Sequence, residues 1–167
     1  MIHESVQSLI YIENEVKSIS INKESSKLPK IIAVSKTFGL DKVLPLIDHG
    51  HLDFGENKVQ EAIKKWTDIK NKNPQIQLHM IGKLQSNKVK YAVKLFDYIH
   101  SLDNEKLAKK IADEQNKIDK KIKIFLQVNI GDENQKSGIN KKIKIFLQVN
   151  IGDENQKSGI SKNEVSK

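Results

Sequence analysis

The chain has 167 residues, 37% of them hydrophobic, a formal net charge of +8 and no cysteine. This length predicts one domain, and the hydrophobic content is sufficient for a core, which argues against wholesale disorder. The absence of cysteine excludes disulfides and thiolate metal sites and suits a reducing compartment. No apolar run approaches the roughly 20 residues that cross a bilayer, and the N-terminus lacks a signal-peptide pattern, so we expect a cytoplasmic protein without a membrane partner.

The positive charge is a reason to consider nucleic acid as a partner. All 29 basic residues are lysines, however, and they are scattered through almost every amphipathic stretch. Arginine, which makes bidentate contacts to bases and phosphates, does not occur in the sequence. Aromatic residues make up only 5%, too few for a base-stacking surface. We therefore predict no nucleic-acid partner.

Strand and helix patterns alternate along most of the chain. Residues 2–19 place apolar side chains at helical spacing, and a polar connector follows over 20–29. Strands are predicted over 30–35, 51–54, 76–81, 98–101 and 122–130, and helices over 41–50, 57–69, 86–96 and from about 103 to 118. Strands that alternate with helices indicate right-handed βαβ units around a parallel sheet. The sequence thus predicts an α/β fold.

The pattern breaks after the last predicted strand, because residues 120–139 recur without one difference at 141–160. A solenoid needs three or more repeats, and nothing upstream shares this period, so the identity indicates a recent duplication or an error in the sequence. A capping-box pattern after the second copy, at 161–164, predicts a helix. The link between the copies is short and polar, so the second strand is expected to pair antiparallel, lie at an exposed edge or fail to pack.

Lys36 stands where the first predicted strand ends. It follows the apolar and β-branched run 31–34, and residues 38–41 then interrupt the strand pattern. An α/β barrel places its chemistry at the carboxyl ends of buried strands. Desolvation at such a position disfavours an ammonium group and frees the neutral amine that forms a Schiff base with an aldehyde. The alternative is an ordinary solvated lysine just past a strand.

Further motifs follow Lys36 in a fixed order: 54–62 (FGENKVQEA), 79–88 (HMIGKLQSNK), 126–130 (LQVNI) and 136–139 (KSGI). With these motifs, the chain from about residue 30 to 139 resembles the pyridoxal phosphate homeostasis proteins, whose fold is like the N-terminal barrel of alanine racemase. The resemblance implies a partial TIM-type (β/α) barrel, roughly the first five units plus the duplicated strand, as one incomplete domain over 1–167. It also implies pyridoxal 5′-phosphate (PLP) held as an aldimine on Lys36, and PLP-dependent apo-enzymes as candidate recipients.

The resemblance assigns more residues to the cofactor site. Asn57 matches a family position close to PLP, although it could also cap a helix. His79 and Gly82 would line the interior or permit close approach of the backbone; a strand histidine can otherwise be a hydrogen-bonded core residue. The remaining candidates are Ser86, Asn87 and Lys88, which begin a predicted helix where an anion could bind, and Lys136, which could face the same rim. The plainer alternative makes Ser86 a helix cap and Lys88 a solvated residue, and Lys157 duplicates Lys136.

Three functions remain open at this point. The first is a PLP-binding homeostasis protein without catalytic turnover, and the second is a PLP-dependent racemase-like enzyme. The third is a non-functional fragment, because a complete barrel takes at least about 200 residues. The glycine-methionine-serine and arginine-isoleucine-glycine-threonine segments that hold the phosphate in the resembled family do not occur in this sequence. We predict no metal site, since no acid or histidine at ligand spacing completes one around His49 and His51.

Overall fold

The computed structural model describes residues 2–22, 28–129, 138–140, 149–150 and 160–161. Its centre is a five-stranded parallel sheet in which the strands follow one another in chain order. The strands are β1 (Ala33–Val34), β2 (Asp53–Glu56), β3 (Gln77–Met80), β4 (Tyr98–Leu102) and β5 (Lys123–Leu126). This arrangement confirms the predicted α/β class, with strand ends that differ by a few residues from the sequence-based boundaries.

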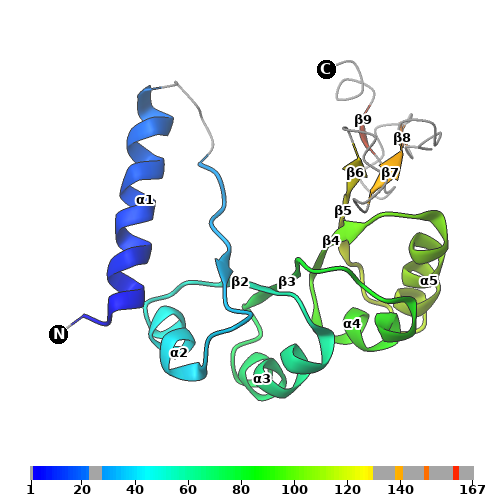
Figure 1. Cartoon of the computed structure of the whole chain (residues 1–167), viewed down its shortest axis with the longest axis horizontal. Helices are drawn as coiled ribbons and strands as arrows, with labels where there is room; N and C mark the ends of the chain where they lie inside the picture. The colour runs from blue at the N-terminus through cyan, green and yellow to red at the C-terminus, as the bar shows by residue number, and fades with distance from the viewer. Residues whose placement is uncertain (1, 23–27, 130–137, 141–148, 151–159, 162–167) are drawn as a thin grey trace.

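The connecting helices lie along the outer side of the curved sheet, and Figure 1 shows them following its arc. They are α2 (Leu40–Asp48), α3 (Val59–Lys72), the short 3-10 helix η1 (Ser86–Lys88) with α4 (Val89–Leu95), and α5 (Glu105–Asn116). The first helix, α1 (Glu4–Asn22), contacts α2 through the ion pair of Glu4 with Lys42 and stands beside the segment that leads into β1. The result is part of a barrel wall, with helices on the convex face and an open concave face.

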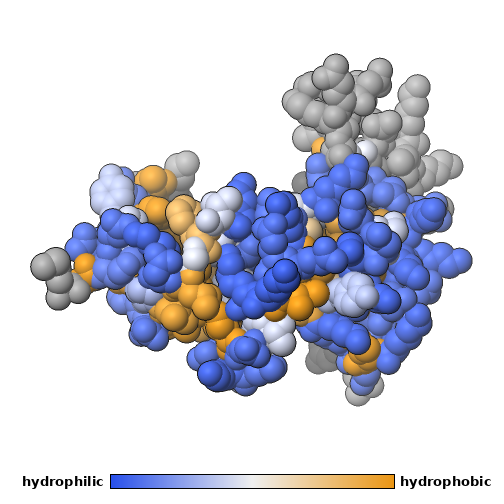
Figure 2. All heavy atoms as spheres, turned by 60° about the horizontal axis from the view of Figure 1, so that its bottom comes forward, coloured by the Kyte–Doolittle hydropathy of each residue, from blue (hydrophilic) through white to orange (hydrophobic). Residues whose placement is uncertain are grey.

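The hydrophobic core fills the space between the sheet and these outer helices. Alternate strand residues point outward because side chains of a strand alternate between its two faces. Phe54 of β2 packs against Trp66 of α3 with ring centroids 4.8 Å apart, and both side chains are fully buried. Leu78 and Met80 of β3 join the same core. Hydrophilic residues cover most of the outer surface beyond this core, with hydrophobic residues in bands between them (Figure 2).

The strand predicted over 122–130 is divided in the structure. The Gln127 N–H still donates to the Leu102 carbonyl over 2.8 Å, but the chain then leaves the main sheet. The next strand, β6 (Val128–Asn129), pairs in parallel with β7 (Ile139–Asn140) in a separate two-stranded sheet. Apolar and polar residues alternate from Leu126 to Ile130, so nothing in the sequence indicated this break.

The second copy of the repeat is described only at its ends. There β8 (Val149–Asn150) pairs in parallel with β9 (Ile160–Ser161), the same pairing that β6 and β7 make one repeat earlier. The antiparallel pairing that we considered is therefore wrong for these described residues. Most of the helix predicted over 161–164 lies outside the described residues, and Ser161 itself is in β9.

Candidate functional site

Lys36 lies in a tight turn directly after β1. The turn covers residues 35–38, here called the lysine turn, and the Phe38 N–H donates to the Ser35 carbonyl over 3.1 Å. The turn carries the Lys36 side chain into solvent, so the burial expected at this strand end is wrong. Within the described part of the chain, no group forms a hydrogen bond or ion pair with the Lys36 ammonium. The amine is therefore available to a ligand.

A buried carboxylate lies directly behind the lysine turn. Glu56, at the end of β2, is fully buried, and its Oε1 accepts a hydrogen bond from the Ser35 hydroxyl over 2.8 Å. The same oxygen accepts from Trp66 Nε1 over 3.0 Å and from Lys65 Nζ over 2.9 Å. Lys65 also donates to the Ser35 and Phe38 carbonyls over 2.7 and 2.9 Å. Glu56 and Lys65 were not predicted from the sequence, and a glutamate at the end of a buried strand was the signal that could have found them.

Asn57 and Gly82 meet at the same edge of the sheet, after β2 and β3. A Cβ atom added to Gly82 would lie 2.4 Å from the Asn57 carbonyl oxygen, so the absence of a side chain permits the contact. This agrees with the expected close backbone approach at Gly82. The Ser101 hydroxyl holds the other side of Gly82 by donating to its carbonyl over 2.7 Å. The helix-cap alternative for Asn57 is wrong, because the N-cap of α3 is Lys58 and no side chain caps it.

The three residues expected to open a helix after β3 form the 3-10 helix η1 instead of the first turn of an α-helix. Gln85 precedes this helix without a side-chain cap, so the capping alternative for Ser86 is also wrong. Ser86 and Asn87 are exposed, whereas Lys88 is half-buried and shares a cavity of about 590 Å³ with Asn57. This cavity brings Asn57 and Lys88 together, and neither Lys36 nor His79 is among its lining residues. Lys136 lies outside the described residues.

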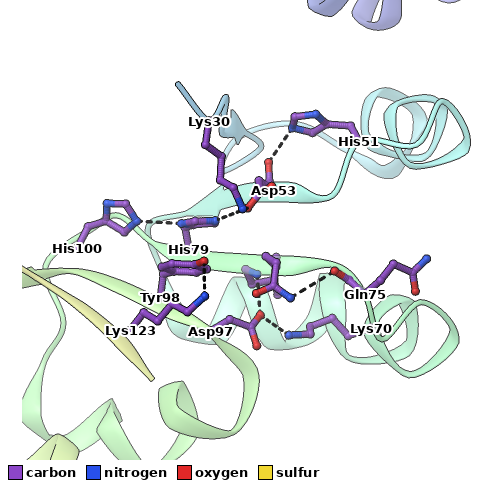
Figure 3. A network of polar contacts seen from close by, with 12 residues as sticks. Lys30, His51, Asp53, Lys70, Gln75, His79, Asp97, Tyr98, His100 and Lys123 are labelled. Atoms are coloured by element: carbon purple, nitrogen blue, oxygen red, sulfur yellow. Dashed lines mark hydrogen bonds and ion pairs between the residues drawn. The ribbon is translucent and has the colours of Figure 1, made fainter. Parts of the chain in front are cut away.

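His79 points to the concave face of the sheet, where it joins a chain of polar contacts (Figure 3). The side chain is only 2% exposed. Its Nε2 lies 3.0 Å from Asp53 Oδ1, and its Nδ1 lies 2.9 Å from His100 Nε2. Since the carboxylate can only accept, Nε2–H of His79 donates to Asp53, and Nδ1 accepts from His100. Asp53 also pairs with Lys30 over 3.0 Å.

Burial lowers the pKa values of His79 and His100, the two histidines in this set of polar contacts. It lowers the pKa of His79, against the hydrogen bond and negative charge of Asp53, which act to raise it. Burial also lowers the pKa of His100, and the nearby His79 acts in the same direction. The Tyr98 ring stacks on His79 with centroids 4.2 Å apart and completes the packing. His79 is therefore a hydrogen-bonded interior residue, which is the alternative that we set beside a role in the cofactor site.

His79 nevertheless lies close below the candidate site. In the sheet register, Val34 pairs with Gly55, and Gly55 pairs with His79. Lys36 follows two residues after Val34 in the chain. The carboxyl ends of β1, β2 and β3 thus bring Lys36, Asn57 and Gly82 to one edge of the sheet, one level beyond His79. This is the edge at which barrel enzymes and binding proteins place ligands.

The family of the alanine racemase N-terminal domain matches residues 19–142 of the chain. The chain belongs to this family. The pyridoxal phosphate homeostasis protein of Pasteurella multocida is 34% identical over 133 residues, which are 79% of this chain and 57% of that protein. The protein of the same name from Buchnera aphidicola is 42% identical over 117 residues, 70% of this chain and 51% of that protein. The chain spans about half the length of the curated relatives it matches.

Solved structures agree with this family and its fold. PipY of Synechococcus elongatus PCC7942, solved without and with PLP, is 35% identical, with TM-scores of 0.62 and 0.61 over 72% of this chain and 57% of that one. A protein from Bifidobacterium adolescentis described as unknown is 26% identical, with a TM-score of 0.63 over 77% of this chain and 57% of that one. The predicted family and barrel-type α/β fold are confirmed. No helix among the described residues has the length and apolar character needed to span a membrane.

Proposed function

We propose that this family member binds PLP as an aldimine on Lys36 and contributes to intracellular PLP homeostasis. The observation that carries the proposal is the lysine turn, which presents the Lys36 amine to solvent without a described partner. Relatives named pyridoxal phosphate homeostasis proteins, and a PipY structure with PLP bound, supply the identity of the ligand. PLP-dependent apo-enzymes as recipients and a cytoplasmic location belong to the same proposal.

The described residues fit the aldehyde end of PLP. When bound, PLP supplies an aldehyde that a neutral amine can attack, with loss of one water molecule. Lys36 is an exposed amine at the carboxyl end of β1, held on a closed turn. Gly82 lets the loop after β3 pack on the backbone of Asn57, which fixes the neighbouring wall of the site. The remaining candidates, His79, Ser86, Asn87, Lys88 and Lys136, stay predictions for the rest of the cofactor.

Covalent capture at Lys36 tests the proposal directly. The full chain would be mixed with PLP, reduced with borohydride and digested, and the adducts located by mass spectrometry. With 29 lysines present, the site of the adduct is the decisive result. We expect one dominant adduct on Lys36, lost in Lys36→Ala and retained in Lys106→Ala, a change at an exposed lysine of α5. Adducts spread evenly over many lysines would overturn the proposal, and exchange of the α-hydrogen of an added amino acid would favour the racemase-like alternative.

A further inference from the structure

Lys65 holds the lysine turn at both of its ends. Its Nζ donates to the carbonyl of Ser35, the first residue of the turn, over 2.7 Å and to that of Phe38, the last residue, over 2.9 Å. The direct hydrogen bond across the turn, from the Phe38 N–H to the Ser35 carbonyl, is longer at 3.1 Å. The Lys65 side chain is only 15% exposed, and its contact with the Ser35 carbonyl is partly buried, whereas its contact with the Phe38 carbonyl lies at the surface. One ammonium group from α3 thus fixes the backbone on both sides of Lys36.

Glu56 keeps that ammonium in place. The carboxylate is fully buried, and its Oε1 lies 2.9 Å from Lys65 Nζ. The same oxygen accepts from the Ser35 hydroxyl, so β2 is joined to the lysine turn by a second route. Trp66 Nε1, the adjacent side chain of α3, donates to it as well. A buried charge with this number of charge-assisted and neutral hydrogen bonds has one favourable geometry, which makes the arrangement rigid.

We propose that Lys65 and Glu56 are positioning residues that set the orientation of the Lys36 amine. Both side chains contact the lysine turn, and they join β1, β2 and α3 at the point where Lys36 leaves the sheet. A turn without this support samples several backbone conformations, and the amine then spends less time in the orientation that binds. The inference rests on the proposed function for the identity of the ligand, whereas the support of the turn can be measured without PLP.

The test compares Lys65→Met with Lys72→Met, a matched change at an exposed lysine in the last turn of α3. Hydrogen exchange of the Phe38 amide, in the absence of PLP, reports on the turn itself. Borohydride-trapped adduct at Lys36, measured against PLP concentration and against pH, reports on the orientation of the amine. Urea unfolding separates both from global stability. We expect Lys65→Met to speed exchange at Phe38, weaken PLP binding about tenfold and move the pH midpoint of adduct formation, and Lys72→Met to change none of these.

The outcomes separate the inference from the function on which it rests. If the wild-type chain forms no Lys36 adduct, the proposed function is contradicted. Faster Phe38 exchange in Lys65→Met would still show that Lys65 supports the turn. Lys65→Met with lower global stability but unchanged adduct affinity and pH midpoint overturns the inference, because the contact is then structural only. If Lys65→Met does not fold, Ser35→Ala replaces it, since this change removes the hydroxyl that donates to Glu56 and, over a longer 3.4 Å, to the Gly55 carbonyl, and leaves Lys65 in place. Unchanged Phe38 exchange and PLP affinity in Ser35→Ala would then count against the inference.

Discussion

Gly82 lies against the backbone of Asn57 with no room for a side chain between them. A Cβ at position 82 would lie 2.4 Å from the Asn57 carbonyl oxygen and 2.8 Å from its Cα. Both neighbours are backbone atoms, so they cannot rotate away as a side chain would. The loops after β2 and β3 therefore depend on glycine at this position for their spacing.

Gly82→Ala is expected to destabilise the fold by about 1–3 kcal/mol, the usual cost of forcing extra volume into a packed region. Gly55→Ala is the graded comparison, because its Cβ would meet side-chain methyl groups at longer distances, Ile81 Cδ1 at 3.2 Å and Ile32 Cγ2 at 3.3 Å. Urea unfolding should show the larger loss for Gly82→Ala, together with weaker PLP capture at Lys36. Equal stability of the two variants would contradict the tight contact described here.

The order of the elements was predictable because the hydrophobic pattern changes period between strands and helices. Each strand of the main sheet was predicted to within a few residues of its position, since a short run such as 76–81 between turn residues fits a buried strand better than a helix. The division of 122–130 at Gln127 was not predictable, because apolar and polar residues keep alternating from Leu126 to Ile130, as they would in one continuous strand. The local sequence does not determine which neighbouring strand a segment pairs with, because that depends on the tertiary structure.

The candidate site was predictable in part, for a related reason. Lys36 was found because it ends an apolar run. Gly82 was assigned through the resemblance to the pyridoxal phosphate homeostasis proteins, with close approach of the backbone as one of its two expected roles. The exposure of Lys36 agrees with the alternative of a solvated lysine just past a strand. The sequence could not decide between that alternative and burial, because the outcome depends on the turn that follows β1. The contacts of Glu56 with Ser35 and Lys65 join residues 21 and 9 positions away in the chain, and only the fold brings them together.

The pH dependence of stability should reflect His79 and His100. Burial lowers the pKa of both side chains in the folded protein, so the unfolded chain takes up protons first as the pH falls. Above the unfolded value of about 6.5, both states are neutral and the histidines contribute no pH dependence. Below it, the free energy of unfolding should decline until the pH reaches the lower folded pKa values.

Urea titrations between pH 8 and pH 5 measure this decline. His100→Gln removes one of the two groups and should make the decline shallower. His49→Gln, a change at an exposed histidine after α2, serves as the control and should leave the slope as in the wild type. An identical slope in His100→Gln would show that the buried chain of contacts is not the source of the acid sensitivity.

Replacing the carboxylate of Glu56 tests how much its contacts with the lysine turn and Lys65 contribute to the free energy of unfolding. Glu56→Gln keeps an oxygen acceptor but removes the charge that pairs with Lys65, and it places an amide N–H₂ where Oε2 now has no partner among the described residues. A buried group left without a partner costs about 1–3 kcal/mol, and more when a charge loses its pair. Chemical denaturation of Glu56→Gln should show at least that loss. Glu61→Gln, at an exposed position of α3, should stay within about 1 kcal/mol of the wild type.

The same substitution in each copy of the repeat tests which copy forms β5. Ile124 of β5 pairs with Ile99 of β4 and packs, half-buried, against the core. Ile145, outside the described residues, is the same residue in the same local sequence of the second copy. If the first copy forms β5, Ile124→Ala should lower the free energy of unfolding by about 1–3 kcal/mol, somewhat below the cost at a fully buried site, and Ile145→Ala should not. The reverse result would place the second copy in the sheet. Small and equal losses in both variants would mean that the identical copies exchange beside β4, since the unmutated copy then takes the position.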